Sequence, residues 1–245
     1  MDIFAFPPLT LLLDGAYRAL IQLVDLLEPL AGTTAAALAV ILVTLLVRTL
    51  LIPVGVSQAK TERTRARLAP KLRDLQKHHG KDRERLQRET MSLYRDEHAS
   101  PLAGCLPLLV QAAVIGVLYT LFLRPQIVGH ANALLSHDLF GAPLGSSLVH
   151  AVGSGLDPAT AIAWAVVLVV LLVVAEVTRR AFRPQAPLEG RLARRGMLGL
   201  MGALHYLTAV FAVFMPLAAA LYLVVTVAWT LAQRTLLRRR YPLPA

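Results

Sequence analysis

The sequence has few of the residue types on which a soluble enzyme depends. Its single cysteine, Cys105, among 245 residues excludes an intramolecular disulfide and a metal site built from several cysteines. Charged residues make up only 16% of the chain and aromatic residues 6%, whereas hydrophobic residues make up 56%. Because that hydrophobic fraction exceeds what a soluble core needs, we interpret the chain as a membrane protein.

Motifs of common enzyme classes are also missing. The chain has no His-Glu-x-x-His sequence, no Asp-rich prenyl-diphosphate motif and no glycine-rich phosphate loop followed by Lys-Ser/Thr. Ser154 and His205 are residue types found in intramembrane serine proteases, but Ser154 falls in an expected outer loop. The adjacent His78 and His79 point apart on a helix, which disfavours a shared metal. We expect no enzymatic activity, no catalytic residues, no metal and no cofactor.

Long apolar runs predict five transmembrane helices. About 20 apolar residues cross a hydrocarbon core of roughly 30 Å. The last run, from Met197 to Ala232, is too long for one crossing and has Pro216 near its middle, so we divide it into two short spans. The expected spans are 35–56, 99–124, 159–176, 201–215 and 217–233.

Lysine and arginine are absent from 125–158, and 22 of the 25 lie in 57–98, 177–203 and 233–245. Because these residues collect in cytoplasmic loops, five spans place the N-terminus outside and the C-terminus in the cytoplasm. Four spans would put the basic tail outside, against this rule. The expected parts outside the membrane are an outer loop over 125–158, a cytoplasmic loop over 177–200 and a cytoplasmic tail over 234–245.

Polar residues at helical spacing predict an amphipathic helix within the N-terminal segment 1–34. Asp14, Arg18, Gln22 and Asp25 alternate with apolar residues, which favours a helix lying flat on the outer membrane surface. The alternative is a poorly inserted sixth span, which the charges in its centre disfavour. The start of the chain lacks the basic residues of a signal peptide, so we expect this segment to be retained.

The basic segment 57–98 predicts a cytoplasmic helical hairpin. Each half has an apolar stripe, and Gly80 interrupts the pattern between them. With 12 basic and seven acidic residues, the segment is either a solvated, salt-bridged surface or a contact surface for anionic lipid or ribosomal RNA, and the two are compatible. The residues expected to contact substrate or ribosome are Arg63, Arg67, Lys71, Arg73, Lys77, Lys81, Arg83 and Arg85.

Arg48 is a charge inside the first expected span, about eight residues from its inner end. A charge in lipid costs at least ~2.5 kcal/mol, and no Asp or Glu lies deep enough in a span to neutralise it. We interpret Arg48 as part of a polar groove that attracts an anionic or acidic binding partner. The alternative is that its long side chain snorkels to the interface and the groove is only a packing seam. The other expected groove residues are Thr44, Gln111, Thr226 and Gln233.

The order of these parts resembles the YidC-type membrane protein insertases. The first span carries Thr44-Leu45-Leu46-Val47-Arg48 and closes on Pro53, and a basic hairpin follows. Pro101-Leu102-Ala103-Gly104-Cys105-Leu106-Pro107 then leads to Gln111, and the last span, from Pro216 to Gln233, is also similar. The resemblance runs from about Leu9 to Arg240 and is to the short, five-span bacterial form of the YidC/Oxa/Alb family.

The resemblance implies an all-α integral membrane protein of the bacterial plasma membrane, with five transmembrane helices around a hydrophilic groove. It also implies the outer amphipathic helix, the cytoplasmic hairpin and a place for Tyr222 in the groove. Such a protein takes nascent single- or few-span proteins from the cytoplasm into the bilayer. Its implied partners are these clients, the ribosome, the Sec translocon and anionic lipids, without recognition of a specific nucleic acid sequence.

Two alternatives remain beside the insertase. One is a small anion or solute transporter or channel that uses Arg48, although the halves of the chain show no repeat of the kind common in transporters. The other is a chaperone that assists folding without carrying out insertion.

Overall fold

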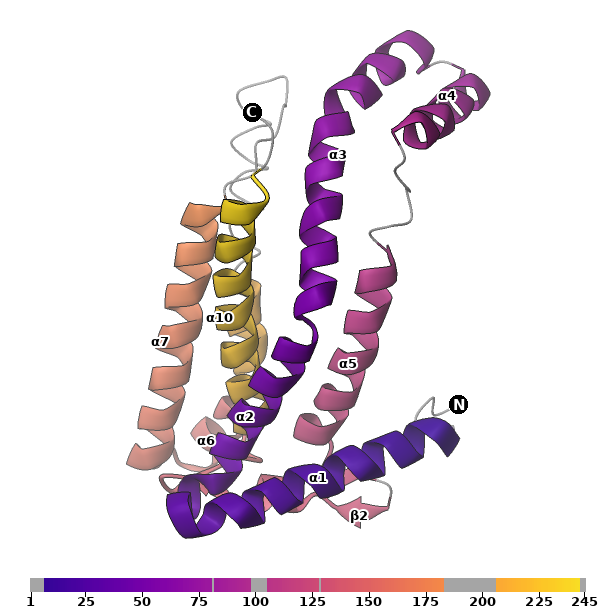
Figure 1. Ribbon diagram of the computed structural model, residues 1–245. Coiled ribbons are helices and arrows are strands. Elements are labelled where there is room, and N and C mark those ends of the chain that lie inside the picture. The colour runs from indigo at the N-terminus through magenta and orange to yellow at the C-terminus, as the bar shows by residue number, and fades with distance from the viewer. Residues whose placement is uncertain (1–6, 81, 98–104, 128, 183–205, 243–245) are drawn as a thin grey trace. The chain divides into compact units, whose positions relative to one another are not determined.

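The structure is a computed structural model that describes residues 7–80, 82–97, 105–127, 129–182 and 206–242 (Figure 1). Within these residues it is mostly helical, and its sheets are two small antiparallel hairpins. Three helical stretches are long and apolar enough to cross a membrane: Thr10–Leu50, Pro158–Ala181 and Leu217–Arg240. The predicted all-α membrane protein is therefore confirmed, whereas the number of spans stays a prediction.

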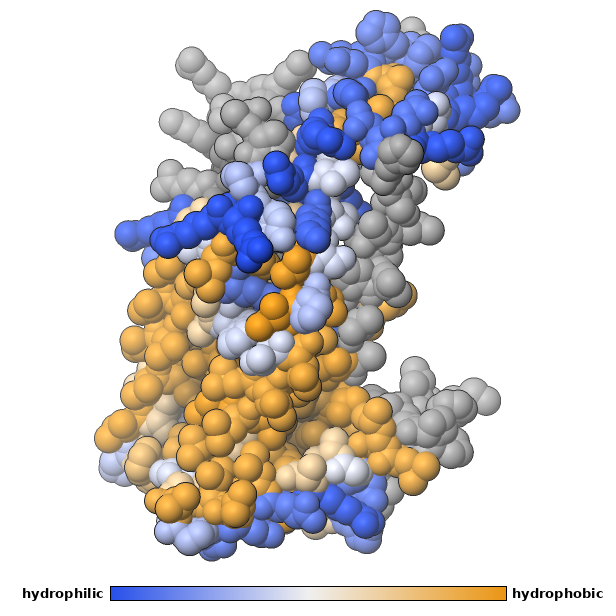
Figure 2. All heavy atoms as spheres, in the orientation of Figure 1, coloured by the Kyte–Doolittle hydropathy of each residue, from blue (hydrophilic) through white to orange (hydrophobic). Residues whose placement is uncertain are grey.

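The chain divides into two compact units. The first unit consists of Met1–Arg48 and Gly116–Leu231, and the second consists of Thr49–Ile115 and Ala232–Ala245. Figure 2 shows apolar side chains over the helices of the first unit and hydrophilic side chains over the hairpin of the second. Each unit is described by itself below.

Helix α1 (Pro7–Ala31) is followed by a short 3-10 turn, η2 (Gly32–Thr34), and by α2 (Ala35–Leu50). In Figure 1, α1 lies crosswise to α2. Leu13, Leu20 and Val24 form its buried stripe. The Tyr17 hydroxyl joins α1 to the segment that follows α5 (Cys105–Leu123), because it donates to the Ala131 carbonyl at 3.3 Å and accepts from the Ala133 N–H at 2.9 Å. Exposed leucines at 11, 12, 26 and 30 give α1 further apolar surface.

The segment after α5, up to residue 157, contains short elements held by side-chain hydrogen bonds. Asn132 donates to the carbonyls of Leu121 and Arg124, at 2.8 and 2.9 Å, and so fixes the segment to the end of α5. Ser147 caps α6 through the His150 N–H. The elements are β1 (Gln126–Ile127) paired with β2 (His130–Ala131), η4 (Ala133–Ser136), β3 (Asp138–Leu139) paired with β4 (Ala142–Pro143), and α6 (Leu148–Ser154).

Helix α7 (Pro158–Ala181) has the character of a lipid-facing span. Its buried residues recur every three or four positions from Thr160 to Ala175 and form one face, while Val166, Val169 and Val173 are exposed. A helix that is apolar on its exposed face as well as its buried face suits a lipid environment. Asp157 caps its start by accepting from the Thr160 N–H at 2.9 Å.

The last two helices differ in length from the expected spans. Helix α9 covers Leu207–Ala212, and residues 183–205, which include most of the expected cytoplasmic loop, lie outside the described residues. Helix α10 (Leu217–Arg240) begins directly after Pro216 and continues seven residues past 233, where we placed the end of the fifth span. Within the first unit, the start of α10 is tightly packed, because Leu217, Ala218 and Ala220 are fully buried.

The second unit contains the hairpin of α3 (Ile52–His79) and α4 (Arg83–Asp96). The helix α3 starts at Ile52, with Pro53 in its first turn, where the missing proline N–H costs no helical hydrogen bond. It runs through position 56, where we had ended the first span. Asp82 caps α4 by accepting from the Arg85 N–H at 3.0 Å, and Gly80 lies in the turn between the helices.

Glu97, directly after α4, closes the hairpin onto α3. Its carboxylate accepts from Arg67 at 2.8 Å and from Lys71 at 2.5 Å, residues one turn apart on α3. The hydrogen bond from Lys71, with the attraction of Arg67, holds the pKa of Glu97 below its usual range. The end of α10 also meets α3 in this unit, because Arg238 lies 3.5 Å from Glu62 and Lys60 lies over the Tyr241 ring.

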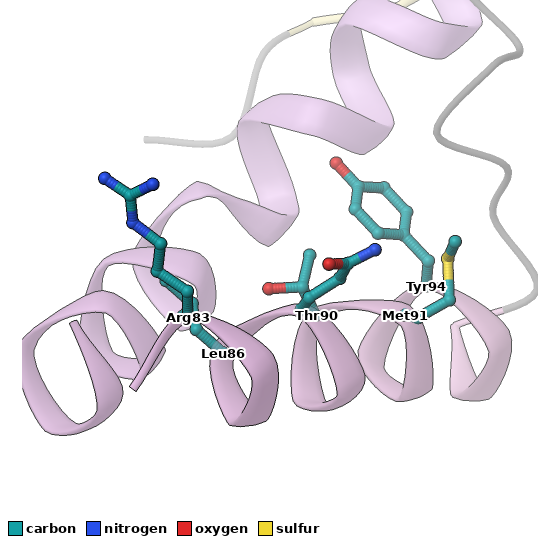
Figure 3. Close-up of a pocket in the computed structure, with 6 residues that line it drawn as sticks. Arg83, Leu86, Thr90, Met91 and Tyr94 are labelled. Carbon is teal, nitrogen blue, oxygen red and sulfur yellow. The ribbon is translucent and has the colours of Figure 1, made fainter. Parts of the chain in front are cut away.

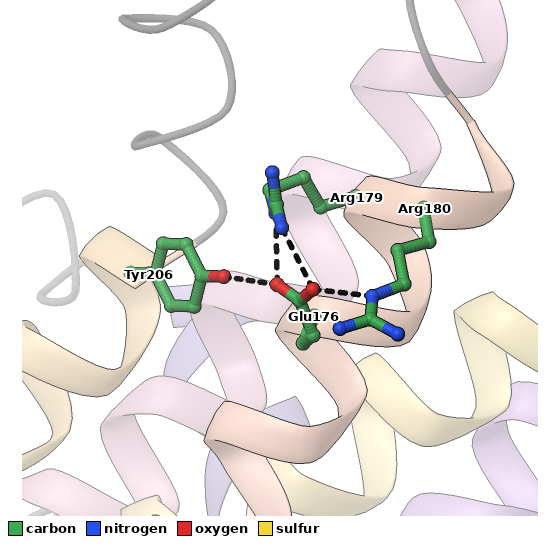
Figure 4. Close-up of polar contacts among 4 residues, drawn as sticks. All are labelled: Glu176, Arg179, Arg180 and Tyr206. Atoms are coloured by element: carbon green, nitrogen blue, oxygen red, sulfur yellow. Dashed lines mark hydrogen bonds and ion pairs between the residues drawn. The ribbon is translucent and has the colours of Figure 1, made fainter.

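Glu176 joins the end of α7 to the start of α9 (Figure 4). Its two oxygens accept from Arg179 at 2.7 and 2.8 Å and from Arg180 at 2.5 Å, and it also accepts from the Tyr206 hydroxyl. Tyr206 is 30 residues away and stands at the N-cap of α9. This carboxylate therefore holds both ends of the connection between the two helices.

We expect Tyr206→Phe to lower the midpoint of thermal unfolding, because it removes the only one of these hydrogen bonds that joins α7 to α9. The measurement is thermal unfolding of the full chain in detergent. Tyr119→Phe, at an exposed tyrosine of the first unit, serves as the matched control. Equal midpoints for the two variants would show that the Glu176 contact does not stabilise the helix pair.

The lowered pKa of Glu97 predicts a pH-dependent hairpin. An unfolded glutamate titrates near pH 4.3, so the ion pairs stabilise the hairpin fully above that pH and are lost as pH falls through the lower folded pKa. We expect Glu97→Gln at neutral pH to lower the protection factors of the α4 amides, that is, the exchange rates corrected for their intrinsic pH dependence, to the values that wild type reaches only in acid. The control is Glu84→Gln, whose 3.7 Å pair with Arg88 stays within α4. Unchanged exchange in Glu97→Gln would contradict this role.

Candidate functional site

Arg48 lies in the last turn of α2 and is buried, with 7% of its surface exposed. No carboxylate of the described residues forms an ion pair with it. A cation in the last turn of a helix gains about 0.3–1 kcal/mol from the helix dipole, which offsets only part of the cost of at least ~2.5 kcal/mol in lipid. The position therefore keeps a positive charge whose cost the described residues do not fully offset.

Thr44 lies one turn before Arg48 on the same face of α2 and is fully buried. Its hydroxyl donates to the Val40 carbonyl at 2.6 Å, so what it offers to other groups is its acceptor oxygen. The pair thus presents a fixed positive charge and a hydrogen-bond acceptor from one helix face.

Tyr222 and Thr226 lie one turn apart on α10. The Tyr222 ring is buried against Phe122, with ring centroids 5.7 Å apart and the planes tilted by 42°. The Thr226 hydroxyl oxygen is enclosed and has no hydrogen-bond partner among the described residues. Because an enclosed polar group without a partner costs about 1–3 kcal/mol, this hydroxyl indicates a place for water or a visiting polar group.

In the second unit, Gln111 and Gln233 both meet the first two turns of α3. Gln58 donates its side-chain N–H to the Gln111 side-chain oxygen at 3.3 Å. A Cβ atom added at Gly55 would lie 1.9 Å from the Gln233 side-chain nitrogen, so a larger residue there would displace the end of the Gln233 side chain. Gly55 and Gln58 are three residues apart and share one face of α3.

The six expected groove residues therefore form two sets. Thr44 and Arg48 on α2, and Tyr222 and Thr226 on α10, belong to the first unit, whereas Gln111 and Gln233 approach α3 in the second. That all six line a single groove stays a prediction. Sequence reasoning missed Gln58 and Gly55, although their place at the end of the first apolar run and just after it, close to Pro53, was a usable signal.

The basic residues of the hairpin are exposed along α3 and α4. Arg67 and Lys71 also hold Glu97, which sequence reasoning did not identify as their partner. Lys81 lies outside the described residues. The exposed set is Arg63, Arg67, Lys71, Arg73, Lys77, Arg83 and Arg85.

One face of α4 carries a shallow, mainly apolar pocket of about 340 Å³ within this basic hairpin. Figure 3 shows Arg83, Thr90 and Tyr94 rising from one side of the helix. The pocket is lined by Leu86, Thr90 and Tyr94 at helical spacing together with the exposed Met91. Apolar contact surface with a basic residue at its end suits an apolar segment with acidic neighbours.

Comparison with known proteins identifies the family. A family model described as "60Kd inner membrane protein" matches residues 27–243. Membrane protein insertase YidC of Alkalihalophilus pseudofirmus is 35% identical over 131 residues, which cover 51% of this chain and 49% of that protein. The protein of the same name from Oceanobacillus iheyensis is 42% identical over 99 residues, covering 38% and 39%. That from Clostridium perfringens is 31% identical over 115 residues, covering 47% and 48%.

The matched part of this chain thus spans about half the length of these relatives, or less. The family model, in contrast, covers most of the chain. Its match starts within the last turns of α1 and extends past the end of α10. The chain therefore belongs to the 60Kd inner membrane protein family, the YidC/Oxa/Alb family that its sequence resembles.

Proposed function

We propose that this protein is a membrane protein insertase that takes nascent single- or few-span proteins from the cytoplasm into the lipid bilayer. The observation that carries the proposal is Arg48, a buried cation in an apolar helix without a carboxylate partner among the described residues. The relatives matched in sequence are named membrane protein insertases, which supports the same activity here.

Arg48 recruits the polar flank of a client. Two unit charges 4 Å apart attract by about 4 kcal/mol at an effective dielectric constant of 20, so an acidic residue in a client tail is drawn to this position. The 7% exposure of Arg48 argues against a side chain that extends along the lipid-facing surface, which the snorkelling alternative requires. An arginine side chain held within the protein attracts a client's acidic residue to a defined position, whereas a side chain that extends to the membrane–water interface does not.

The remaining polar groups shorten the apolar distance that a hydrophilic tail must cross. Thr44 offers an acceptor, Thr226 an unpartnered hydroxyl, and Gln111 a side-chain amide at the first turns of α3. A hydrated path of such groups lowers the barrier without an external energy source. The driving force is then the burial of about 20 apolar residues of the client in lipid.

The hairpin makes the first contact with the client, on the cytoplasmic side. Its exposed basic residues attract acidic flanks, anionic lipid headgroups and the ribosome, and the apolar pocket on α4 accepts part of the client's hydrophobic segment. The Sec translocon is a further proposed partner. The proposed topology has five spans, an outer N-terminus and a cytoplasmic C-terminus. The function is binding and release rather than catalysis.

We expect Arg48→Ala to reduce insertion of a small single-span client with an acidic outer tail by at least about tenfold, because losing even about 1.4 kcal/mol of the ~4 kcal/mol attraction corresponds to that factor. Arg48→Lys keeps the charge and is expected to keep most activity. The measurement is protease protection of the client in liposomes that contain the purified protein. Arg18→Ala, at an exposed arginine of α1, is the matched control. Equal insertion by all variants would remove Arg48 from the mechanism.

A photo-crosslinking residue at Met91 tests the role of the α4 pocket. We expect it to crosslink to the apolar segment of a ribosome-bound client, because Met91 is exposed and lines the pocket. The same residue placed at Glu89, two positions away and so on the opposite side of α4, is expected to crosslink weakly. Equal crosslinking at both positions would show that the pocket does not select clients.

A further inference from the structure

The turn between β3 and β4 carries an exposed aromatic ring. These strands pair through Leu139 and Ala142, so Phe140 and Gly141 form a two-residue hairpin turn. Phe140 has 76% of its surface exposed, the highest value of any phenylalanine that the structure describes. The ring belongs neither to the proposed groove nor to the α3–α4 hairpin, so the insertase proposal leaves it without a role.

The backbone conformation of this turn disfavours a phenylalanine. Phe140 and Gly141 have φ angles of 52° and 89°, and a type I′ turn requires two such positive values. Asn-Gly is the preferred pair in this turn, whereas a bulky side chain at positive φ is strained. In the described ranges, Phe140 is the one residue other than glycine with a positive φ. A strained residue whose ring touches little of the protein indicates that the ring contacts something else.

The turn lies against the start of α7. A Cβ atom added at Gly141 would be 3.5 Å from the Ala159 Cβ, an ordinary van der Waals distance. Ala159 is the second residue of α7, which is long and apolar enough to cross a membrane. Phe140 therefore lies near the level at which this span begins, and phospholipid headgroups occupy that level.

The exposed face of α7 continues from this contact. Ile162 and Val166 follow Ala159 at helical spacing, and 66% and 58% of their surfaces are exposed. A helix that is apolar on its exposed face as well as its buried face suits lipid. The ring of Phe140 thus extends the lipid-facing surface of α7 beyond the first turn of the helix.

The residues that lead into α7 also expose apolar side chains. Val149 and Val152 lie three positions apart on α6, and Leu156 follows that helix. All three are exposed and stand shortly before the span begins. Apolar side chains of this kind are buried when a short segment lies at the boundary between headgroups and acyl chains.

Backbone hydrogen bonds join the β3–β4 hairpin to the start of α10. The carbonyl of Leu144, directly after β4, accepts from the Ala218 N–H at 3.0 Å. The carbonyl of Ser146 accepts from the Leu217 N–H at 3.1 Å. The hairpin therefore contacts the start of α7 through its turn and holds the start of α10 through the residues that follow it.

We propose that the β3–β4 turn is a membrane anchor, which inserts Phe140 into the boundary between phospholipid headgroups and acyl chains where α7 begins. Removal of the ring from water offsets the strain of the turn. Because the same hairpin contacts α7 and α10, the anchor fixes the depth at which both helices start in the lipid. The proposal requires that α7 cross the membrane, and it does not depend on the insertion of clients.

The test places a fluorescent ring at the turn of the full chain in phospholipid liposomes. Phe140→Trp keeps an aromatic side chain, and the signal of Trp164 and Trp229 is subtracted with wild type. Bromine on a lipid quenches tryptophan on contact, so lipids brominated near the headgroup are compared with lipids brominated near the chain ends. The added fluorescence is expected to fall mainly with the former, because an interfacial side chain reaches only about 5–10 Å into the headgroup–acyl boundary.

Val169→Trp is the matched control, on the exposed face of α7. This position lies about 16 Å along the helix from Pro158, so its fluorescence is expected to fall mainly with chain-end bromine. Acrylamide, a quencher dissolved in the water on both sides of the membrane, is expected to affect neither signal strongly. Quenching of the Phe140→Trp signal by acrylamide but not by bromine would overturn the anchor and leave the ring to a protein partner.

A second measurement uses the unsubstituted turn. A phospholipid with a photoreactive group near its headgroup is expected to label the wild-type peptide that contains Phe140. Phe140→Asn is expected to lose most of this label while it keeps the hairpin, because Asn-Gly is the preferred pair for the turn. Absence of the label in wild type, or equal label in the two proteins, would overturn the anchor.

Discussion

The cost of placing a charge in an apolar helix is the constraint on which the proposed activity depends. Helix α2 is almost wholly apolar, yet Arg48 stands in its last turn, buried and without a carboxylate among the described residues. The helix dipole recovers only part of that cost. Because burying this cation costs free energy, we infer that Arg48 serves to attract a client rather than to stabilise the fold. The free-energy cost of this one residue therefore supports the activity proposed for the chain.

The stabilising ionic contacts lie elsewhere. Glu176 fixes the end of α7 to the start of α9, and Glu97 fixes α4 onto α3. In both places one carboxylate receives two basic side chains, so the local charges are compensated. Arg48 differs from these basic residues in having no such contact within the described residues. Among the described residues, the carboxylates of Glu176 and Glu97 are thus paired with basic side chains, whereas Arg48 is a buried charge in the last turn of an apolar helix without such a pair.

Much of the architecture could be predicted from composition and periodicity. Apolar runs indicated the helices of the membrane region, the stripe in 57–98 indicated a hairpin, and the motifs around Arg48 and Gln111 indicated the family, which the comparison confirms. Such features are local or depend on hydrophobicity, and both can be read from a single sequence.

Other features depend on contacts between distant residues and could not be predicted in this way. Tyr17 meets Ala131 and Ala133 across more than 110 positions, and Tyr206 meets Glu176 across 30. The helix ends also differ from the ends of the expected spans: α2 ends at Leu50 and α3 starts at Ile52, inside the expected first span, and α10 continues to Arg240, past the expected fifth span. The hydropathy pattern marks where the membrane ends rather than where a helix ends.

The central claim is that the charge of Arg48 selects the client. The most direct measurement is a charge exchange in reconstituted liposomes, in which wild type and Arg48→Glu each receive two otherwise identical single-span clients, one with an acidic outer tail and one with a basic outer tail. The account predicts that wild type favours the acidic tail and that Arg48→Glu favours the basic tail. The same preference in both proteins, or none in either, would contradict it.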